Sequence, residues 1–256
     1  MRIGVYIDGY NLYYGGRRHC GGGTLPWKWF NPRTMVEGAL AHQLSFAVQA
    51  GHTQTVNTWM NATVDRVVYC TARISGVRNP TAATDQDIYL SAIKSASAVD
   101  HIEYGIYKSR VKQAPLATQQ RGQAPEPVTS GGPVIVMDPS WKPLGGAMFK
   151  VSYQSDEEKG SDVNVASHLL IDVLTGTVDA AIVVSNDSDL KFAVSFARSR
   201  VPVGVINPRG GRAVADLVAP GTVGSSHHWN RNLRPEDFTQ NQLPDPAGGF
   251  RKPSGW

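Results

Sequence analysis

The amino-acid sequence predicts an α/β fold with a mainly parallel central sheet that is covered by helices on both faces. One observation leads to this prediction. Short apolar segments rich in β-branched residues alternate with segments of helical periodicity. Apolar strands in this alternating order are typical of parallel sheets with helices on each side. The chain has 256 residues, which is enough for one sizeable core.

The first half of the chain contains three predicted strands, which cover residues 3–7, 66–72 and 101–107. Asn31 followed by Pro32 predicts the start of a helix, because Asn is a good cap and Pro suits the first helical position. A weaker helical pattern covers residues 85–98. Residues 10–23 are rich in Tyr and Gly and have no period, so a loop is predicted there.

The second half contains two predicted strands, residues 180–184 and 201–206, and three predicted helices, residues 161–174, 189–198 and 212–218. Ser161 fits the N-cap of the first of these helices, and Gly176 fits its end.

Two segments differ from the rest in composition. Residues 111–147 are rich in Gln, Ala, Pro, Gly and Thr, and are predicted to form a flexible insertion. Residues 133–138 and 148–153 fit the two strands of a hairpin. Residues 220–256 show neither a helical nor a strand-like hydrophobic periodicity, and are predicted to form an extended C-terminal tail. The predicted domain therefore spans residues 1–219.

The composition excludes several classes of protein. No run of apolar residues approaches the length of a membrane span, and the first residues lack the hydrophobic region of a signal peptide. Cys20 and Cys70 are too few for a disulfide scaffold or a cysteine-based zinc site. These features predict a cytoplasmic protein without a membrane partner.

Four aspartates are predicted to meet at one edge of the sheet if the first and fourth strands are neighbours. Asp8 ends the first strand, Asp187 and Asp189 follow the fourth, and Asp162 lies in the first turn of a helix. The carboxyl ends of parallel strands share one edge, where sites usually form. Carboxylates in one cleft repel one another, and Mg²⁺ or Mn²⁺ with its oxygen ligands relieves that repulsion. Each aspartate taken alone is equally explained as a cap or a turn residue.

Other phosphate and nucleotide chemistries lack their motifs. The sequence contains no P-loop, no dinucleotide-binding glycine motif after the first strand and no nucleophile elbow. A phosphatase of the haloacid dehalogenase type needs two aspartates one residue apart after the first strand, and the second of these positions is Tyr10 here.

Three segments together resemble the NYN domain of the PIN-like nuclease superfamily, and its LabA-like bacterial branch in particular. They are VYIDGYNLYY at residues 5–14, EKGSDVNVA at residues 158–166 and VSNDSDL at residues 184–190. The resemblance spans residues 1–219. It implies a three-layer α/β/α fold and a Mg²⁺- or Mn²⁺-dependent acidic site that cleaves RNA. The family's site residues match Asp8, Asn11, Asp162, Asp187 and Asp189.

One position departs from the family pattern. Many NYN domains have a further aspartate six residues after the helix aspartate, where this chain has His168. On a helix, that residue lies about 240° around from Asp162 and nearly two turns away. We therefore expect His168 to have a structural role or to lie behind the direct metal ligands, paired with Asp172 one turn further on.

The leading hypothesis is a metal-dependent ribonuclease that hydrolyses RNA phosphodiester bonds. Asp8, Asp162 and Asp187 would hold the metal, and Asp189 would ligate it or orient a water. Asn11 would hydrogen-bond a ligand carboxylate or a substrate phosphate. A metal-activated water would then attack the phosphorus.

Aromatic and basic side chains are the candidate substrate contacts. Tyr10 and Tyr13 fit stacking on the bases of single-stranded RNA, and packing under a loop explains them equally well. Basic residues near predicted strand ends or loops are candidates for phosphate contacts; they are Arg73, Arg78, Lys159, Lys191, Arg209 and Arg212. Each of them alone is also explained as a solvated surface charge.

The charge distribution fits this hypothesis. Residues 155–190 contain one base and eight acids, which gives this segment a net charge of −7. Because the whole chain has a net charge of +4, the remaining residues carry +11. An acidic patch within a basic chain suits a metal site beside bound phosphates. Two alternatives remain open: a non-catalytic RNA-binding or regulatory module on the same fold, and a metal-dependent small-molecule phosphohydrolase. The sequence leaves the oligomeric state open, a homodimer included.

Overall fold

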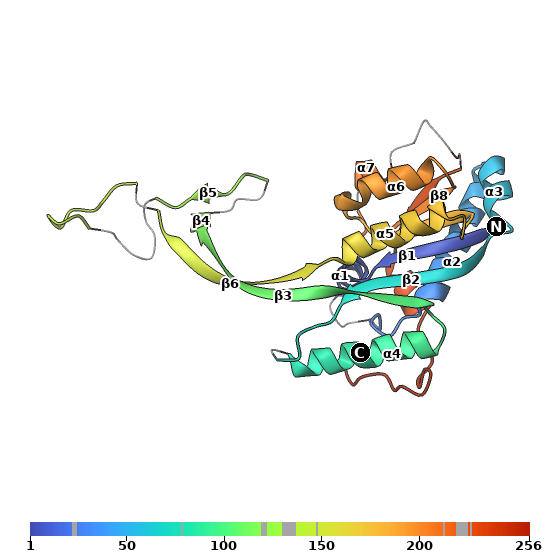
Figure 1. Cartoon of the computed structure of the whole chain (residues 1–256), viewed down its shortest axis with the longest axis horizontal. Helices are drawn as coiled ribbons and strands as arrows, with labels where there is room; N and C mark the ends of the chain where they lie inside the picture. The colour runs from blue at the N-terminus through green and yellow to red at the C-terminus, as the bar shows by residue number, and fades with distance from the viewer. Residues whose placement is uncertain are drawn as a thin grey trace. The chain divides into compact units, whose positions relative to one another are not determined.

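Figure 1 shows a computed structural model of the chain. It describes residues 1–21, 25–77, 79–118, 122–129, 137–146, 148–211, 213–218, 225 and 227–256. The chain divides into two compact units. Met1–Tyr107 and Glu158–Trp256 together form the first, and Lys108–Glu157 form the second. In the described ranges, the search for a helix both long and apolar enough to cross a membrane found none.

A seven-stranded sheet has the strand order β6-β3-β2-β1-β7-β8-β9. Its strands are β1 (Arg2–Asp8), β2 (Thr63–Ala72), β3 (His101–Pro115), β6 (Lys150–Lys159), β7 (Ala180–Val184), β8 (Val203–Asn207) and β9 (Trp229–Asn232). β1 lies between β2 and β7 and is parallel to both, and the pairs β2–β3, β7–β8 and β8–β9 are also parallel. The predicted α/β fold with a mainly parallel sheet is confirmed, and the first and fourth predicted strands are neighbours.

Helices cover both faces of this sheet, which gives three layers (Figure 1). They are α1 (Gly9–His19), α2 (Pro32–Gln49), α3 (Thr53–Trp59), α4 (Pro80–Ser95), α5 (Ser161–Leu174), α6 (Lys191–Arg198), α7 (Ala215–Val218) and α8 (Pro235–Thr239), with a short 3₁₀ helix, η1 (Ser188–Leu190). Along β1, Ile3, Val5 and Ile7 join one buried cluster and Tyr6 joins the other. This alternation assigns α1–α4 and α8 to one face and α5–α7 to the other.

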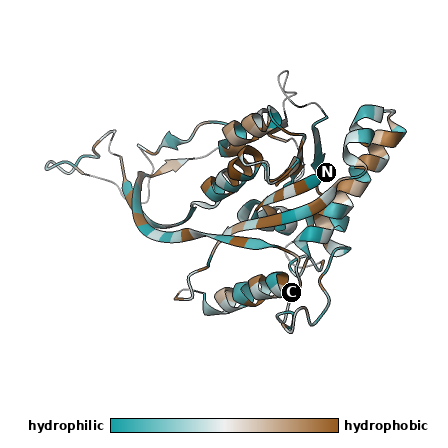
Figure 2. Ribbon diagram, turned by 45° about the vertical axis from the view of Figure 1, so that its right-hand side comes forward, coloured by the Kyte–Doolittle hydropathy of each residue, from teal (hydrophilic) through white to brown (hydrophobic). Residues whose placement is uncertain are grey.

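The flanking helices carry hydrophobic and hydrophilic residues together, as Figure 2 shows. This mixture is expected of helices that pack one side on a sheet and expose the other. The predicted starts of two helices can be compared with the structure. Asn31 caps α2 by accepting hydrogen bonds from the backbone of Arg33 and Thr34. The cap of α5 is Gly160 rather than Ser161, in a left-handed conformation with φ of 96° that favours glycine.

The predicted loop at residues 10–23 is wrong, because Gly9–His19 form helix α1. The Asp8 side chain caps this helix by accepting from the backbone N–H of Asn11. The two glycines that suggested a loop serve packing instead. A Cβ on Gly15 would lie 2.2 Å from the Pro208 carbonyl oxygen, and one on Gly16 would lie 2.5 Å from the Trp27 ring. Only glycine permits these close approaches within a helix.

The predicted tail at residues 220–256 is also wrong where the structure describes it. Trp229–Asn232 form β9 at the sheet edge and are followed by α8. Leu233, Phe238 and Leu243 are buried in the core on the α1–α4 face. The segment lacks a period because isolated large side chains, rather than one regular element, anchor it. The first unit therefore extends to Trp256 and does not end at residue 219.

The predicted insertion at residues 111–147 has different bounds in the structure, where the second unit covers Lys108–Glu157. The third strand is longer than predicted and reaches Pro115. Within the unit, β4 (Ala117–Thr118) pairs with β5 (Glu126–Pro127) in antiparallel fashion. The first strand of the predicted hairpin lies largely outside the described residues, and its second strand falls in β6 from Lys150 onward.

Candidate metal centre

Asp8 is the most deeply buried of the four predicted aspartates. It ends β1 and is only 1% exposed. Its Oδ1 accepts from the Asn11 backbone N–H at 2.9 Å, and its Oδ2 accepts from the Ser185 hydroxyl at 2.9 Å. Burial raises the pKa of Asp8, while the hydrogen bonds from Asn11 and Ser185 oppose that rise. Two hydrogen bonds therefore fix this buried carboxylate in place.

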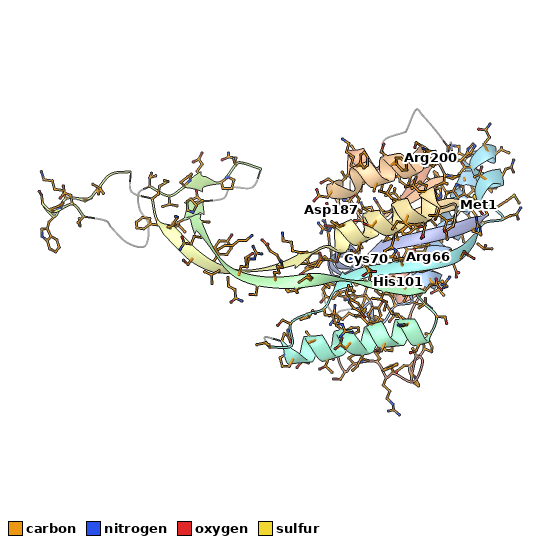
Figure 3. The ribbon with its side chains drawn as sticks, viewed as in Figure 1. Met1, Arg66, Cys70, His101, Asp187 and Arg200 are labelled. Atoms are coloured by element: carbon orange, nitrogen blue, oxygen red, sulfur yellow. The ribbon has the colours of Figure 1, made fainter. Side chains whose placement is uncertain are left out.

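Ser185 connects Asp8 to the loop that carries Asp187. Its Oγ donates to Asp8 and accepts from the Asp187 backbone N–H at 3.1 Å. Asp187 caps η1 by accepting from the Asp189 N–H at 3.0 Å. Figure 3 labels Asp187 and Cys70, which lie at the carboxyl end of the same parallel sheet. The pairing of β1 with β7 brings this loop beside Asp8.

Asp162 lies in the first turn of α5 and is half-buried. Its pKa is raised to about 7, first by burial and then by the negative charges of Asp8, Asp187, Glu158 and Asp189. The structure therefore places the four predicted aspartates at one end of the sheet, close enough for their charges to act on Asp162, although no three of their carboxylates have oxygen atoms within 4.8 Å of one another.

Glu158 is a fifth acidic residue in this group, and sequence reasoning did not single it out. It accepts hydrogen bonds from the backbone N–H and the hydroxyl of Ser161, at the start of α5. A glutamate three residues before a helix start was a readable signal, because such side chains often satisfy the free N–H groups there. Burial and the charges of Asp8, Glu103, Asp162 and Glu158 raise the pKa of the Cys70 thiol, which places Cys70 among these acids.

The donor set fits a hard divalent cation. Asn11 is 3% exposed, and its side-chain oxygen is buried without a hydrogen-bond partner among the described residues. A buried carbonyl oxygen without a partner is costly, and oxygen atoms of this kind bind Mg²⁺ and Mn²⁺. Asp8, Asp162, Asp187 and Asp189 would supply the carboxylates and Asn11 a neutral oxygen.

The predicted basic residues do not all lie at this site. Burial and the neighbouring tyrosines raise the pKa of Tyr10 to about 12, and the positive charge of Arg209 opposes this rise, so Arg209 lies near the first predicted base-stacking residue. Arg73 instead lies 4.8 Å over the Tyr104 ring and 3.8 Å from Asp87. Lys159 and Lys191 are exposed. Lys159 follows Glu158 directly, and Lys191 begins α6. Arg78 and Arg212 lie outside the described residues.

Tyr10 and Tyr13 line a pocket of about 340 Å³. Nine of its lining residues are aromatic, among them Trp27, Tyr89 and Trp256. The pocket is also lined by Gly9, which follows Asp8, by Glu158 of the acidic group, and by the cations Arg17 and Lys28. The distance between the ring centroids of Tyr13 and Trp27 is 5.1 Å. The tyrosines therefore form one wall of an aromatic cavity beside the carboxylates.

The predicted pairing of His168 with Asp172 is wrong. Asp172 instead accepts from the Tyr6 hydroxyl at 3.0 Å and forms an ion pair with Arg66 at 3.0 Å. His168 Nε2 lies 3.2 Å from Glu103 Oε2 on β3. The helix turns His168 toward that strand, a contact between distant segments that helical spacing alone does not reveal.

No family model matches the chain. A 6-hydroxy-3-succinoylpyridine 3-monooxygenase from Pseudomonas putida is 29% identical over 271 aligned positions, which cover 100% of this chain and 75% of that enzyme. A crystal structure of a protein of unknown function from Vibrio parahaemolyticus is similar with a TM-score of 0.44 and 14% identity, over 93% of this chain and 94% of that one. The first of these proteins is an enzyme.

Proposed function

We propose that this protein is a metal-dependent ribonuclease with its site at the carboxyl end of β1 and β7. The observation that supports this proposal is the group formed by Asp8, Asp162, Asp187 and Asp189, in which burial and the charges of the other acids raise the pKa of Asp162 to about 7. A bound Mg²⁺ or Mn²⁺ would activate a water molecule and offset the charge that develops on a phosphodiester.

Each protein group has a distinct task in this proposal. Asp8 is held from two sides and would fix the position of the cation. Asp162 has a pKa of about 7 and would release its proton when the cation binds. Asp189 is exposed at the mouth of the site and would orient a water molecule there. The side-chain oxygen of Asn11 would complete the set of oxygen donors.

The neighbouring pocket supports single-stranded RNA as the substrate. An aromatic wall stacks on bases of any sequence, and only an unpaired base presents a free face to it. Arg209 lies near Tyr10, and Arg17 and Lys28 line the pocket, so three cations are positioned to contact phosphates. A base in the pocket would hold the adjoining phosphodiester near the carboxylates.

The experiment is a cleavage assay with labelled single-stranded RNA, duplex RNA and single-stranded DNA, in Mn²⁺ or in EDTA. We expect Mn²⁺-dependent cleavage of single-stranded RNA, reduced about 100-fold or more in Asp187→Asn, because electrostatic groups at such sites contribute factors of this order. Glu37→Gln, at an exposed position on α2, is the matched control. Equal cleavage by Asp187→Asn would refute the site. RNA binding without cleavage would favour a non-catalytic module, and cleavage of small phosphate esters alone would favour a phosphohydrolase.

A second candidate function follows from the same pocket. Nine aromatic residues together with Arg17 and Lys28 also fit a planar aromatic acid, and the Pseudomonas putida relative is named for a reaction on a succinoylpyridine. In this alternative the chain would oxygenate an aromatic acid. Dioxygen consumption with 6-hydroxy-3-succinoylpyridine and a reduced nicotinamide, compared between the wild type and Arg17→Gln, separates it from the nuclease.

A further inference from the structure

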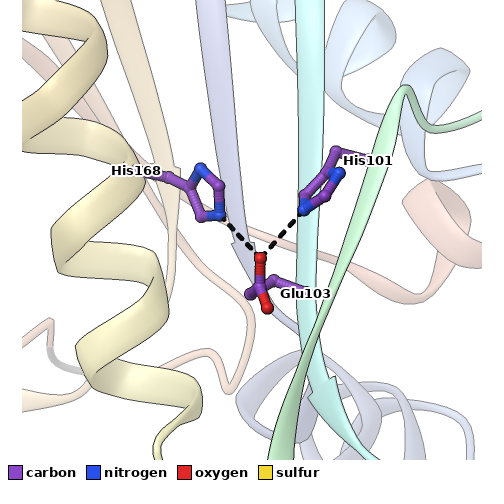
Figure 4. Close-up of side chains that lie close together, drawn as sticks. All are labelled: His101, Glu103 and His168. Carbon is purple, nitrogen blue, oxygen red and sulfur yellow. Dashed lines mark hydrogen bonds and ion pairs between the residues drawn. The ribbon is translucent and has the colours of Figure 1, made fainter.

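We infer that His101, Glu103 and His168 form a second cation site, which binds a first-row divalent metal through two imidazoles and one carboxylate. Within the described part of the chain, these are the three side chains found whose potential ligand atoms all lie within 4.8 Å of one another. In Figure 4 both imidazole rings direct Nε2 toward the same Glu103 oxygen. The inference is independent of the proposed nuclease.

The distances agree with ligands of one ion. Glu103 Oε2 lies 2.9 Å from His101 Nε2 and 3.2 Å from His168 Nε2. Two ligands at about 2.0–2.1 Å from a metal are separated by about 2.8–3.0 Å at a right angle and by about 3.3–3.4 Å at the tetrahedral angle. Both observed separations fall within this range, so small side-chain rotations would be enough to admit the ion.

Two regular elements position the three side chains. His101 and Glu103 are two residues apart on β3, so their side chains lie on the same face of the sheet. His168 is on α5, which covers that face. The centroids of the two imidazole rings are 5.1 Å apart. Because strand and helix fix all three positions, little ordering is needed before an ion binds.

The donor set selects a different metal from the aspartate group. Imidazole nitrogen suits Zn²⁺, Co²⁺ and Fe²⁺, whereas a set of oxygens alone suits Mg²⁺ and Mn²⁺. Two histidines with one carboxylate leave coordination positions for water or a substrate, as in zinc enzymes and non-haem iron oxygenases. The side chains of His101 and Glu103 are 45% and 38% exposed, so the ion would be accessible from solvent.

The two sites lie on the same face of the sheet but are separate. Asp8 is in register with Cys70 on β2, and Cys70 is in register with Glu103 on β3. Two strand spacings place the Cα atoms of Asp8 and Glu103 about 10 Å apart. Metals that act as a pair are about 4 Å apart, so each site would hold its own ion.

The test is a titration of the full chain with Co²⁺, followed by its visible absorption, and with Zn²⁺, followed by calorimetry. Fe²⁺ is titrated in a third arm without oxygen. We expect one Co²⁺ site with the absorption of imidazole ligands, and affinity at least 10-fold weaker in His168→Gln and Glu103→Gln. The exposed His101→Gln is a further variant that leaves the core intact. His42→Gln, at an exposed position on α2, is expected to bind like the wild type, and Asp187→Asn is expected to keep the absorption of the imidazole-bound Co²⁺.

Three results would overturn the inference. These are the absence of Co²⁺ and Zn²⁺ binding at millimolar metal, unchanged affinity in His168→Gln, Glu103→Gln and His101→Gln, or an equal loss in Asp187→Asn, which would assign the ion to the aspartates. Thermal melts of each variant show whether it is folded. Failure of RNA cleavage leaves these outcomes unchanged, because the titration measures metal binding alone.

Discussion

Replacing Asp162 by Asn is expected to stabilise the metal-free protein, although it removes a side chain of the proposed metal centre. The folded chain holds this carboxylate among four other acids, and its pKa is raised from 3.8 to about 7. The unfolded chain therefore releases the proton at a lower pH than the folded chain does. As a result the free energy of unfolding falls as the pH rises from 3.8 to about 7, and the full cost of ionisation is present above that range.

The size of the effect follows from the difference between the two pKa values. At about 1.4 kcal/mol per pH unit, the rise to about 7 sets an upper limit of about 4 kcal/mol. Asp162 is half-buried, and solvent screening reduces the cost to about 1–2 kcal/mol. Asn has nearly the same shape without the charge, so Asp162→Asn should recover this amount at pH 8 and almost none at pH 4.

The assay is urea unfolding of the wild type, Asp162→Asn and the control Glu37→Gln at pH 4 and pH 8 in EDTA. Saturating Mn²⁺ should stabilise the wild type at pH 8 and should stabilise Asp162→Asn much less. A variant that is less stable than the wild type at pH 8, or a gain that is equal at both pH values, would refute the electrostatic reasoning. The control is expected to unfold like the wild type at each pH.

Three further predictions concern the fold. Gly15→Ala should cost about 1–3 kcal/mol in urea unfolding, because the new Cβ would lie 2.2 Å from a backbone oxygen; the control Gly38→Ala has its nearest neighbour at 3.9 Å and should be neutral or stabilising. Tyr6→Phe should cost about 1 kcal/mol, because it removes the hydroxyl that donates to the buried Asp172, and equal stability would contradict this. A chain that ends at residue 219 should fail to fold, because it lacks β9 and the core residues after it; a cooperative melt of that chain would contradict the extended domain.

The parallel sheet could be predicted from the sequence because its strands are short, apolar and separated by regular helices. Helix α1 and the segment from Trp229 onward were not predicted, because tertiary contacts rather than hydrophobic periodicity determine them. The glycines of α1 read as loop residues, and only the approach of Pro208 and Trp27 explains why a helix requires them. The segment from Trp229 onward has no period because single side chains such as Phe238 anchor it by burial.

The candidate site also has a part that could be predicted from the sequence and a part that could not. The aspartates could be located because parallel strands deliver their carboxyl ends to one edge. The contact between His168 and Glu103 joins residues 65 positions apart, and the aromatic pocket gathers Tyr10, Trp27 and Trp256 from distant segments. Contacts of this kind depend on tertiary packing, and the local spacing of residues in one sequence does not predict them.

The most direct test of the central claim is anomalous diffraction from crystals soaked in Mn²⁺. We expect a manganese peak in contact with carboxylate oxygens of Asp8, Asp162 and Asp187 in the wild type, and its loss in Asp187→Asn. Absence of a peak at these aspartates, or manganese only at His101, Glu103 and His168, would contradict it.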